Sequence, residues 1–389
     1  MSEALARFLA DTLAEAGRAA WSTNPVVSAS ASPGRARIDG RERILLCTND
    51  YLGLACDPRV VAAAADALSQ YGFGSRAARS LAGDTDVHRA LEQELADYKG
   101  TQAALTFGSG FSTNVGVIGA LTTADDVICS DALNHASIVD GCRLSAARTA
   151  VYPHGDLDGL EVILRGASSA AKRMIVTDAV FSMDGDVAPL PQIVELADRY
   201  DAFVMLDEAH ATGVLGPEGR GTLAHFDLHG SVPVLMGTLG KALGSVGGFV
   251  TGSRDLVDVL ARKARSFLFT TAPPAAAAAA ALEALRILRA EPERVQRLWD
   301  NARRLHGGLV ELGFDLSPAP APITPVFLHD DRVAADASRV LFDRGVVAHA
   351  IGTPYVPAGT ARLRLISSAA HEPADVDAVL DAFAGLRPA

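Results

Sequence analysis

Seven short apolar runs separated by helical patterns constrain the fold of this 389-residue chain more than any other feature of its sequence. Strand–helix alternation of this kind predicts a mostly parallel β-sheet covered by helices on both faces. Ligands of such sheets bind at the carboxyl ends of the strands. The predicted strands are 103–107, 127–130, 150–152, 174–177, 203–206, 234–236 and 248–251. The predicted helices between them are 113–120, 137–147, 157–165 and 190–200.

The pattern changes after Pro273, where long helices and short strands mix without regular alternation. This succession is typical of a smaller α+β domain. The chain is also too long for one ordinary core, so we expect an α/β protein with more than one part. The predicted helices are 275–290 and 292–312, and the predicted strands are 324–328, 346–349 and 361–366. The expected parts are an N-terminal segment at 1–50, a large domain at 51–280 and a small domain at 281–389.

Charge and apolar segments limit the partners of the chain. The net charge of −11, without a basic run, would repel a phosphate backbone, so no nucleic-acid partner is expected. Glu3, Asp11 and Glu15 near the N-terminus favour an amphipathic helix over a secretion signal. The alanine run near residue 275 is soon interrupted by Glu283 and Arg286, which favours a buried or interface helix over a membrane span.

The four cysteines give no metal or disulfide signature. Cys47, Cys56, Cys129 and Cys142 form no CxxC pair, so neither a zinc site nor a disulfide framework is expected. Buried, reduced thiols are typical of a reducing compartment, and we therefore expect a cytoplasmic protein.

Two short motifs point to functions that the rest of the sequence does not support. Asp207-Glu-Ala-His210 spells the box of a helicase family, which would make the chain a nucleic-acid-dependent ATPase. Such an enzyme needs a GxxxxGK(S/T) loop upstream, and the sequence has none. The stretch 72–77 matches a dinucleotide fingerprint, but it follows a helical segment, whereas the fingerprint must follow a strand.

Asp207, His210 and Lys241 form a stronger constellation. Asp207 ends an apolar strand at the expected ligand-binding edge, where a carboxylate can keep a pyridine nitrogen protonated. An aspartate is equally suited to cap a helix there. Lys241 lies in the glycine-rich stretch 237–244, and a desolvated lysine beside a ligand can form a Schiff base. The alternative is a solvated loop lysine.

Two further segments complete the candidate site. The stretch Gly108–Asn114 lies between a predicted strand and a predicted helix, and free N–H groups at a helix start would bind a phosphate. The stretch Asn134–Ser137 follows the next strand. Its histidine, His135, can stack on a cofactor ring, cap a helix or lie in the core, and the sequence leaves these alternatives open.

Taken in order along the chain, these segments resemble the α-oxoamine synthases, a branch of the fold type I enzymes that use pyridoxal 5'-phosphate. The resemblance covers nearly the whole chain. It implies a fold type I transferase, in which the large domain has a mostly parallel seven-stranded sheet and a smaller α+β domain follows. The motifs are Asn49–Leu54, Thr106–Phe111, Asn134–Ser137, Phe181–Asp186, Asp207–Gly213, Thr238–Lys241 and Pro357–Arg364.

The resemblance also implies roles for single residues. Lys241 would hold the cofactor as a Schiff base and remove the α-proton of the substrate. Asp207 would pair with the ring nitrogen, His210 with the phenolic oxygen, and His135 would stack on the ring and contact the substrate. The other implied cofactor-binding residues are Gly110, Phe111, Ser182, Thr238 and, toward the neighbouring subunit, Thr270 or Thr271. The other implied substrate-binding residues are Arg18, Asn49, Tyr355 and Arg364.

Within that family, Pro357–Arg364 and Asn49–Leu54 favour the branch that acts in biotin biosynthesis. That branch condenses L-alanine with a pimeloyl thioester, carried by CoA or by a carrier protein, and releases carbon dioxide. The alternative is a glycine C-acyltransferase. Ala78 departs from the Ser or Thr of most relatives, in a loop that bounds the amino-acid pocket of the family. The resemblance further implies a homodimer with its active site at the subunit interface.

Overall fold

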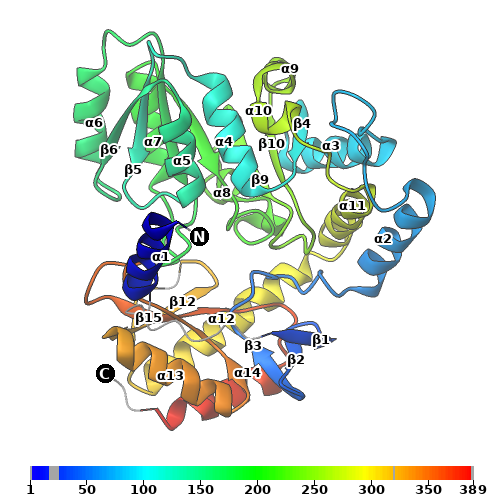
Figure 1. Cartoon of the computed structure of the whole chain (residues 1–389), viewed down its shortest axis with the longest axis vertical. Coiled ribbons are helices and arrows are strands. Elements are labelled where there is room, and N and C mark those ends of the chain that lie inside the picture. The colour runs from blue at the N-terminus through cyan, green and yellow to red at the C-terminus, as the bar shows by residue number, and fades with distance from the viewer. Residues whose placement is uncertain (1, 17–25, 319, 387–389) are drawn as a thin grey trace. The chain divides into compact units, whose positions relative to one another are not determined.

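The computed structural model describes residues 2–16, 26–318 and 320–386 (Figure 1). The chain forms two compact units. The large unit consists of Asn49–Ser182 and Asp186–Gln296, and the small unit consists of Met1–Thr48, Met183–Gly185 and Arg297–Ala389. The domain boundaries expected at residues 50 and 280 concern parts of the chain that would fold independently, and they remain predictions.

A seven-stranded sheet organises the large unit, with the strand order β4-β10-β9-β8-β7-β5-β6. Each of the seven strands predicted from the apolar runs is present, and six of them extend one or two residues beyond the predicted ends. The strands are β4 (Ala103–Phe107), β5 (Val127–Asp131), β6 (Arg148–Tyr152), β7 (Arg173–Asp178), β8 (Phe203–Asp207), β9 (Val234–Thr238) and β10 (Gly248–Gly252).

The strands of this sheet are mostly parallel. β9, β8, β7, β5 and β6 pair parallel in that order, whereas β10 pairs antiparallel with both β9 and β4. Met174, Ile175 and Val176 are consecutive residues of β7, and none of them is exposed to solvent. Consecutive residues point to opposite faces of a strand, so both faces of the sheet are covered. The α/β sheet expected from the sequence is therefore confirmed.

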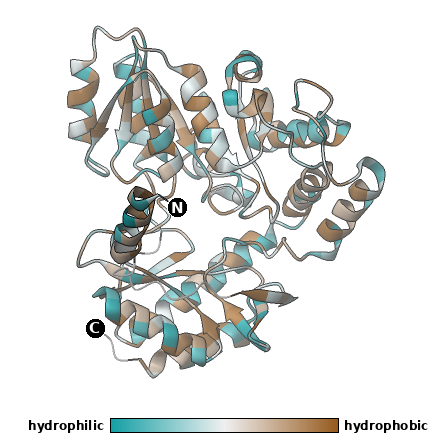
Figure 2. Ribbon diagram, in the orientation of Figure 1, coloured by the Kyte–Doolittle hydropathy of each residue, from teal (hydrophilic) through white to brown (hydrophobic). Residues whose placement is uncertain are grey.

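Amphipathic helices pack against the sheet. In α7, the buried residues Leu190, Ile193, Val194 and Ala197 recur three and four positions apart, which is the spacing of one helix face. Figure 2 shows hydrophobic and hydrophilic residues alternating around the helices of this unit. The helices are α2 (Pro58–Tyr71), α3 (Asp86–Lys99), α4 (Gly110–Leu121), α5 (Ala136–Leu144), α6 (Leu157–Gly166), α7 (Leu190–Arg199), α8 (Thr222–His225), α9 (Arg254–Lys263), α10 (Arg265–Leu268) and α11 (Ala275–Ala290).

The helix predicted at 137–147 ends at Leu144, so its predicted end is wrong. The chain leaves the helix at Ser145, which is extended with φ −71° and ψ 150°. The Ser145 hydroxyl accepts a hydrogen bond from the backbone N–H of Ala147, with 3.0 Å between the two atoms. Serine offers the backbone an alternative to helical hydrogen bonds in this way, and β6 begins directly afterwards.

Two four-stranded sheets and their helices form the small unit. Its core gathers side chains with almost no exposed surface, among them Leu309, Val326, Leu363 and Phe383. The first sheet contains β1 (Val27–Ser32), β2 (Arg35–Ile38), β3 (Arg41–Leu45) and β13 (Val346–Val347). The second contains β11 (Asp315–Leu316), β12 (Ile323–His329), β15 (Ala361–Ile366) and β14 (His349–Ile351). The helices are α1 (Glu3–Ala16), most of α12 (Glu293–Glu311), α13 (Asp331–Asp343) and α14 (Pro373–Ala384).

The single strand predicted at 346–349 is wrong, because the structure has two strands there that belong to different sheets. Val346 and Val347 pair parallel with β3, whereas His349 begins β14, which pairs antiparallel with β15. Ala348 lies between the two strands and is buried. An apolar run predicts burial, but it carries no information about which sheet each residue joins.

In the part of the chain that the structure describes, no helix combines the length and the apolar character needed to cross a membrane.

Candidate active site

The carboxyl ends of the parallel strands bring the candidate residues of the large unit to one sheet edge. β8 ends at Asp207, and β7 ends at Asp178, which lies opposite Asp207 in the strand register. His135 follows β5, and Lys241 follows β9. In open α/β sheets this edge is where ligands bind.

Lys241 belongs to a chain of three hydrogen-bonded side chains. Its Nζ lies 2.7 Å from Nε2 of His210, and Nδ1 of the same imidazole lies 2.7 Å from the hydroxyl of Tyr51. His210 is buried, and Tyr51 has no exposed surface and packs edge-on against the imidazole ring. The imidazole is therefore held at both nitrogens, which fixes its position beside the amine.

Asp207 presents a buried carboxylate with assigned partners for both oxygens. Oδ1 accepts from the backbone N–H of Ala209 at 2.8 Å, and Oδ2 accepts from Nδ2 of Asn114 at 2.7 Å. Only 3% of Asp207 is exposed. Hydrogen bonds donated to a carboxylate favour its charged form, so the residue can place a negative charge beside a ring nitrogen.

Helix α4 begins in a tight setting that is suited to an anion. Ser109 caps its first turn, where the Ser109 hydroxyl accepts from the backbone N–H of Ser112 at 3.0 Å. A side chain at Gly110 would lie 3.2 Å from Cε of Met236 and 3.4 Å from Cβ of Thr238. The start of α4 therefore lies directly against the end of β9, and free N–H groups at a helix start attract phosphate.

Phe111 and Thr238 flank this helix start in different ways. Thr238 is half-buried, and its hydroxyl donates to the backbone carbonyl of Gly247 at 2.9 Å. Phe111 is 46% exposed and lines an open hollow of about 510 Å³ together with Val115 and Leu144. The hydroxyl of Thr238 lies near the expected phosphate, whereas the ring of Phe111 faces the hollow.

His135 caps helix α5 with its imidazole. Its Nδ1 accepts from the backbone N–H of Ser137, and its own backbone N–H donates to Oδ2 of Asp178 at 2.7 Å. Loss of water around the ring lowers the pKa of His135; the carboxylate of Asp207 opposes this shift, and the charge of Lys241 adds to it. Burial, with the charge of Asp207, raises the pKa of Asp178 well above its usual range.

The other predicted residues of the large unit lie in loops. Ser182 lies in a turn after β7 and is half-buried, whereas Thr270 and Thr271 are exposed beyond α10. Asn49 is half-buried, and its Oδ1 is buried without a hydrogen-bond partner among the described residues. An orphaned buried oxygen of this kind is consistent with an amide that binds a ligand.

The remaining predicted residues belong to the small unit. Arg364 lies on β15 opposite His349 of β14 and lines a hollow of about 770 Å³ with His349 and Cys47. Loss of water and the nearby charge of Arg364 lower the pKa of His349. Tyr355 is 66% exposed. Arg18 lies outside the described residues.

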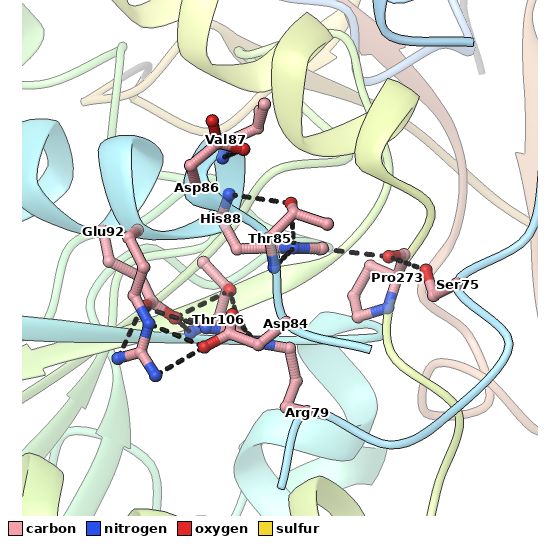
Figure 3. Close-up of polar contacts among 11 residues, drawn as sticks. Ser75, Arg79, Asp84, Thr85, Asp86, Val87, His88, Glu92, Thr106 and Pro273 are labelled. Carbon is pink, nitrogen blue, oxygen red and sulfur yellow. Dashed lines mark hydrogen bonds and ion pairs between the residues drawn. The ribbon is translucent and has the colours of Figure 1, made fainter. Parts of the chain in front are cut away.

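The loop that carries Ala78 is anchored by a buried cluster around Arg79 (Figure 3). The Arg79 guanidinium donates to Asp84 at 2.7 Å, to Thr106 at 2.7 Å and to both carboxylate oxygens of Glu92 at 3.0 and 3.1 Å. Glu92 also accepts from the backbone N–H and the hydroxyl of Thr106. The Arg79 side chain is only 2% exposed, so this two-pronged pair ties the loop to α3 and β4.

The same loop is tied to the segment that follows α10. The hydroxyl of Ser75 donates to the carbonyl of Pro273 at 2.6 Å, and Nε2 of His88 lies 3.0 Å from that carbonyl (Figure 3). The backbone N–H of Ala272 donates to the carbonyl of Ala77 at 3.0 Å. Thr270 and Thr271 therefore directly precede Ala272 and Pro273, which these hydrogen bonds hold in place.

Sequence reasoning missed Tyr51, Asn114, Ser137 and Asp178. The first three lie inside motifs that were singled out for other residues, so their positions carried a signal. Their contacts carried no such signal in the sequence, because Asn114 and Asp207 are 93 positions apart and Tyr51 and His210 are 159 positions apart. No local pattern reports a pairing across such separations.

The assembled residues fit pyridoxal 5'-phosphate. The large unit offers an amine held by an imidazole at Lys241, a buried carboxylate at Asp207, and a helix start at Gly110 where a side chain would meet Thr238. These are the groups that the aldehyde, the ring nitrogen and the phosphate of this cofactor require.

Comparisons with known proteins point in the same direction. The family described as aminotransferase class I and II matches residues 41–383. The 8-amino-7-oxononanoate synthase of Thermoanaerobacter pseudethanolicus is 47% identical over 97% of this chain and 95% of its own length. The enzyme of the same name from Anaeromyxobacter dehalogenans is 50% identical over 90% of this chain and 88% of its own length.

The solved structures with similar folds include two kinds of enzyme. Sphingomonas wittichii serine palmitoyltransferase has a TM-score of 0.94 and 32% identity, covering 99% of this chain and 97% of its own. A high-resolution structure of SPT with PLP has a TM-score of 0.92 and 35% identity, covering 97% and 95%. The 8-amino-7-oxononanoate synthase of Francisella tularensis has a TM-score of 0.75 and 28% identity, covering 88% and 97%.

Proposed function

Because the chain belongs to the class I and II aminotransferases and, among them, to the family of the 8-amino-7-oxononanoate synthases, we propose that it condenses L-alanine with a pimeloyl thioester. The products are 8-amino-7-oxononanoate, carbon dioxide and the free thiol. A bond forms between the α-carbon of alanine and the acyl carbon while the C–S bond breaks. The carboxyl group leaves as carbon dioxide, and a proton takes its place. The enzyme is an acyltransferase of biotin biosynthesis and uses pyridoxal 5'-phosphate.

The contact between Lys241 and His210 carries this proposal. The 2.7 Å between Nζ and Nε2 places an amine beside a buried proton acceptor at the ligand-binding edge of the sheet. Pyridoxal 5'-phosphate supplies an aldehyde that captures an amine and a ring that withdraws electrons from the α-carbon. Lys241 would hold the cofactor covalently, take the α-proton of alanine and return a proton to the product.

Asp207 and the start of α4 orient the cofactor. The Asp207 carboxylate, with donors on both oxygens, keeps a proton on the ring nitrogen opposite it. The backbone N–H groups at Gly110 and Phe111 would hold the phosphate, and the hydroxyl of Thr238 would turn from the carbonyl of Gly247 to donate to it. Ser182 and His210 would contact the ring, and His135 would cover its face.

The amino-acid substrate needs contacts of its own in this proposal. Arg364 binds the carboxylate of alanine with two parallel hydrogen bonds, and Asn49 and Tyr355 contact the same substrate. Ala78, in the loop that Arg79 anchors, leaves room for the methyl group of alanine. Support for Asn49 comes from its buried Oδ1, which has no partner in the described ranges.

We also propose that the protein is a homodimer in which Thr270 or Thr271 reaches the phosphate bound by the partner subunit. Phe73, Leu81 and Phe269 are 83%, 78% and 74% exposed, and they lie on the two segments that Ser75 and Ala77 tie together. Large exposed apolar side chains that gather in this way mark an interaction surface. The expected cytoplasmic location stays a prediction, and the four unpaired cysteines are in keeping with it.

An assay of acyl donors and amino acids tests the proposed reaction. Purified protein with cofactor receives L-alanine and pimeloyl-CoA, and thiol release and carbon dioxide from carboxyl-labelled alanine are measured together. We expect equal amounts of both products and their loss in Lys241→Ala. The comparison substrates are glycine with acetyl-CoA and L-serine with palmitoyl-CoA.

The comparison pairs decide between related functions. Glycine with acetyl-CoA represents the glycine C-acyltransferase alternative. L-serine with palmitoyl-CoA represents the enzyme named in the most similar of the folds described above, at 32% identity. A larger kcat/KM for either pair than for alanine with pimeloyl-CoA would refute the proposed substrate while leaving the reaction class intact.

A further inference from the structure

Two side chains that the proposed reaction does not use connect Asp207 to His135. Asn114 lies on α4 with no exposed surface. Its Nδ2 is 2.7 Å from Oδ2 of Asp207 and 2.8 Å from Oγ of Ser137. Oγ of Ser137 is in turn 2.7 Å from Nδ1 of His135. The carboxylate of Asp207 and the imidazole of His135 are thus joined by one continuous chain of hydrogen bonds.

The chemistry of the groups fixes the direction of every hydrogen bond in this chain. An ionised carboxylate only accepts, so the Asn114 atom that faces Asp207 is the amide nitrogen. That nitrogen has two hydrogens, and its two close acceptors are Asp207 and Ser137. Ser137 therefore accepts from Asn114, and its own hydroxyl hydrogen is directed to Nδ1 of His135.

A second donor points at the same imidazole nitrogen. The backbone N–H of Ser137 lies 3.3 Å from Nδ1 of His135. A nitrogen that receives two donors carries no proton, so the proton of a neutral ring is on Nε2. A protonated ring would instead turn an N–H toward the positive start of α5, which the helix dipole disfavours.

The charged groups around His135 leave this preference in place. Asp178 on β7 accepts from the backbone N–H of His135, Asp207 lies at the end of β8, and Lys241 follows β9. Burial, with the charge of Asp207, raises the pKa of Asp178 well above its usual range. Loss of water around the ring lowers the pKa of His135 despite the charge of Asp207.

The unpaired amide oxygen of Asn114 indicates that the site requires the two hydrogen bonds that its amide nitrogen donates. Its Oδ1 is buried and accepts no hydrogen bond from the described residues. A buried acceptor without a partner destabilises the fold. The position therefore carries an amide at a cost to stability, and the gain is the pair of hydrogen bonds to Asp207 and Ser137.

We propose that Asn114 and Ser137 are positioning residues that hold His135 as the neutral tautomer protonated on Nε2 and, through the same amide, hold the Asp207 carboxylate in place. The consequence for catalysis rests on the proposed function. A neutral imidazole lies against a positively charged cofactor ring without repulsion. Its Nε2–H remains a donor for the carboxylate or the acyl carbonyl of the substrate.

Imidazole nitrogen NMR tests the tautomer directly. Protein labelled with ¹⁵N-histidine is recorded with and without cofactor from pH 5.5 to 8.5, and the His135 signals are assigned by their loss in His135→Gln. We expect an unprotonated Nδ1 and a protonated Nε2 in both forms. A proton on Nδ1 near pH 7 would overturn the proposal.

Substitution of Ser137 tests the relay. Ser137→Ala removes the hydroxyl donor and leaves only the longer backbone contact, so the proton affinity of His135 should rise about tenfold. The acid limb of the kcat/KM profile should move upward by the same amount, with a larger effect on kcat than on KM. Ser137→Thr, which keeps the hydroxyl, should restore both. Ser253→Ala, which removes the capping hydroxyl of helix α9, should change neither.

These measurements separate the inference from the proposed function. The NMR experiment needs no substrate, so a protein that fails to condense alanine with pimeloyl-CoA can still show the predicted tautomer. An unchanged His135 titration in Ser137→Ala would overturn the relay even if the condensation assay succeeds. If Ser137→Ala does not fold, the wild-type and Ser137→Thr spectra still decide the tautomer.

Discussion

Lys99 and Glu208 form an ion pair, with 2.6 Å between Nζ and Oε2, in which the two side chains are only 2% and 1% exposed. Lys99 also donates to the carbonyl of Arg220 at 2.9 Å, and Oε1 of Glu208 accepts from the backbone N–H of Thr222 at 2.6 Å. Glu208 directly follows Asp207 in the chain. The pair therefore fixes the backbone from which the candidate site presents its buried carboxylate.

Removal of one partner from this pair should destabilise the fold strongly. Lys99→Ala leaves the Glu208 charge buried without its cation, and we expect a loss of about 3–5 kcal/mol in the free energy of unfolding. Urea denaturation measures the change. Arg303→Ala is the control, because it breaks an ion pair whose side chains are 59% and 58% exposed, and it should cost less than about 1 kcal/mol. Equal losses in both variants would contradict this account.

Gly110→Ala should weaken cofactor binding. The added methyl group would lie 3.2 Å from Cε of Met236 and 3.4 Å from Cβ of Thr238, so it would crowd the space between the start of α4 and the end of β9. We expect at least a tenfold rise in the Kd for pyridoxal 5'-phosphate, measured by spectroscopic titration. Gly119→Ala is the matched control on the same helix, since nothing lies within 4 Å of its added methyl group. An unchanged Kd in Gly110→Ala would exclude this helix start as the phosphate site.

Tyr51→Phe should alter the pH dependence of the reaction more than the binding of substrate. The variant removes the group that holds Nδ1 of His210, so the imidazole no longer has a fixed position beside Lys241. We expect kcat to fall about tenfold or more, with a shifted pH optimum and a nearly unchanged KM for alanine. Steady-state kinetics from pH 6 to 9 provide the measurement. Tyr200→Phe, on the cap of α7, should behave as wild type.

His154→Gln should destabilise the protein in a pH-dependent manner. His154 bridges Asp131 at 3.0 Å and Asp186 at 2.9 Å, and hydrogen bonds to these carboxylates raise the pKa of His154 to about 10. A histidine with a raised pKa contributes its full stabilisation at pH values below its ordinary pKa of about 6.5. This contribution declines as the pH rises toward 10.

Denaturation at pH 6, 8 and 10 checks the sign. The difference in unfolding free energy between wild type and His154→Gln should be largest at pH 6 and smallest at pH 10. His229→Gln is the control, because His229 is largely exposed and lies 4.0 Å from Asp227. A difference that grows with pH would show that the charged form of His154 does not stabilise the fold.

Mixed dimers should reveal residues that act on the partner's site. Lys241→Ala and the double variant Thr270→Ala, Thr271→Ala are each purified, mixed, unfolded and refolded together. If the threonines serve the neighbouring subunit, the mixed dimer contains one complete site, and activity at limiting cofactor should exceed that of either parent. Lys241→Ala mixed with Asp207→Asn should recover nothing, because both residues serve their own subunit. Equal recovery in the two mixtures would refute the arrangement.

The sheet of the large unit was predictable because its signal is local. Strands such as 203–206 are continuous apolar runs, and their parallel order follows from the helices between them. The end of α5 and the division of 346–349 between two sheets were not predictable. At Ser145 a side chain ends the helix, and at Ala348 the partner strands lie far away in the sequence.

The candidate site likewise contains residues that the sequence predicts and contacts that it does not predict. Lys241, Asp207, His210 and His135 stand out because each lies at or just after the end of a strand of the sheet, at a chemically suited position. The structure places Lys241 against His210. The supporting contacts of Asn114 and Tyr51 depend on how separate elements pack. Asparagine is mostly exposed in proteins and tyrosine is intermediate, so residue type alone predicts neither of these buried contacts.

The small unit is assembled from three stretches of chain, and this has a consequence during translation. The parallel partner of β3 is β13, so the ribosome must add about 300 residues, over about 15–60 s at 5–20 residues per second, before the two can pair. All residues of the large unit are complete at Gln296. The large unit can therefore fold first. Until β13 is made, the edge of the N-terminal strands remains unpaired, and other nascent chains can pair with it.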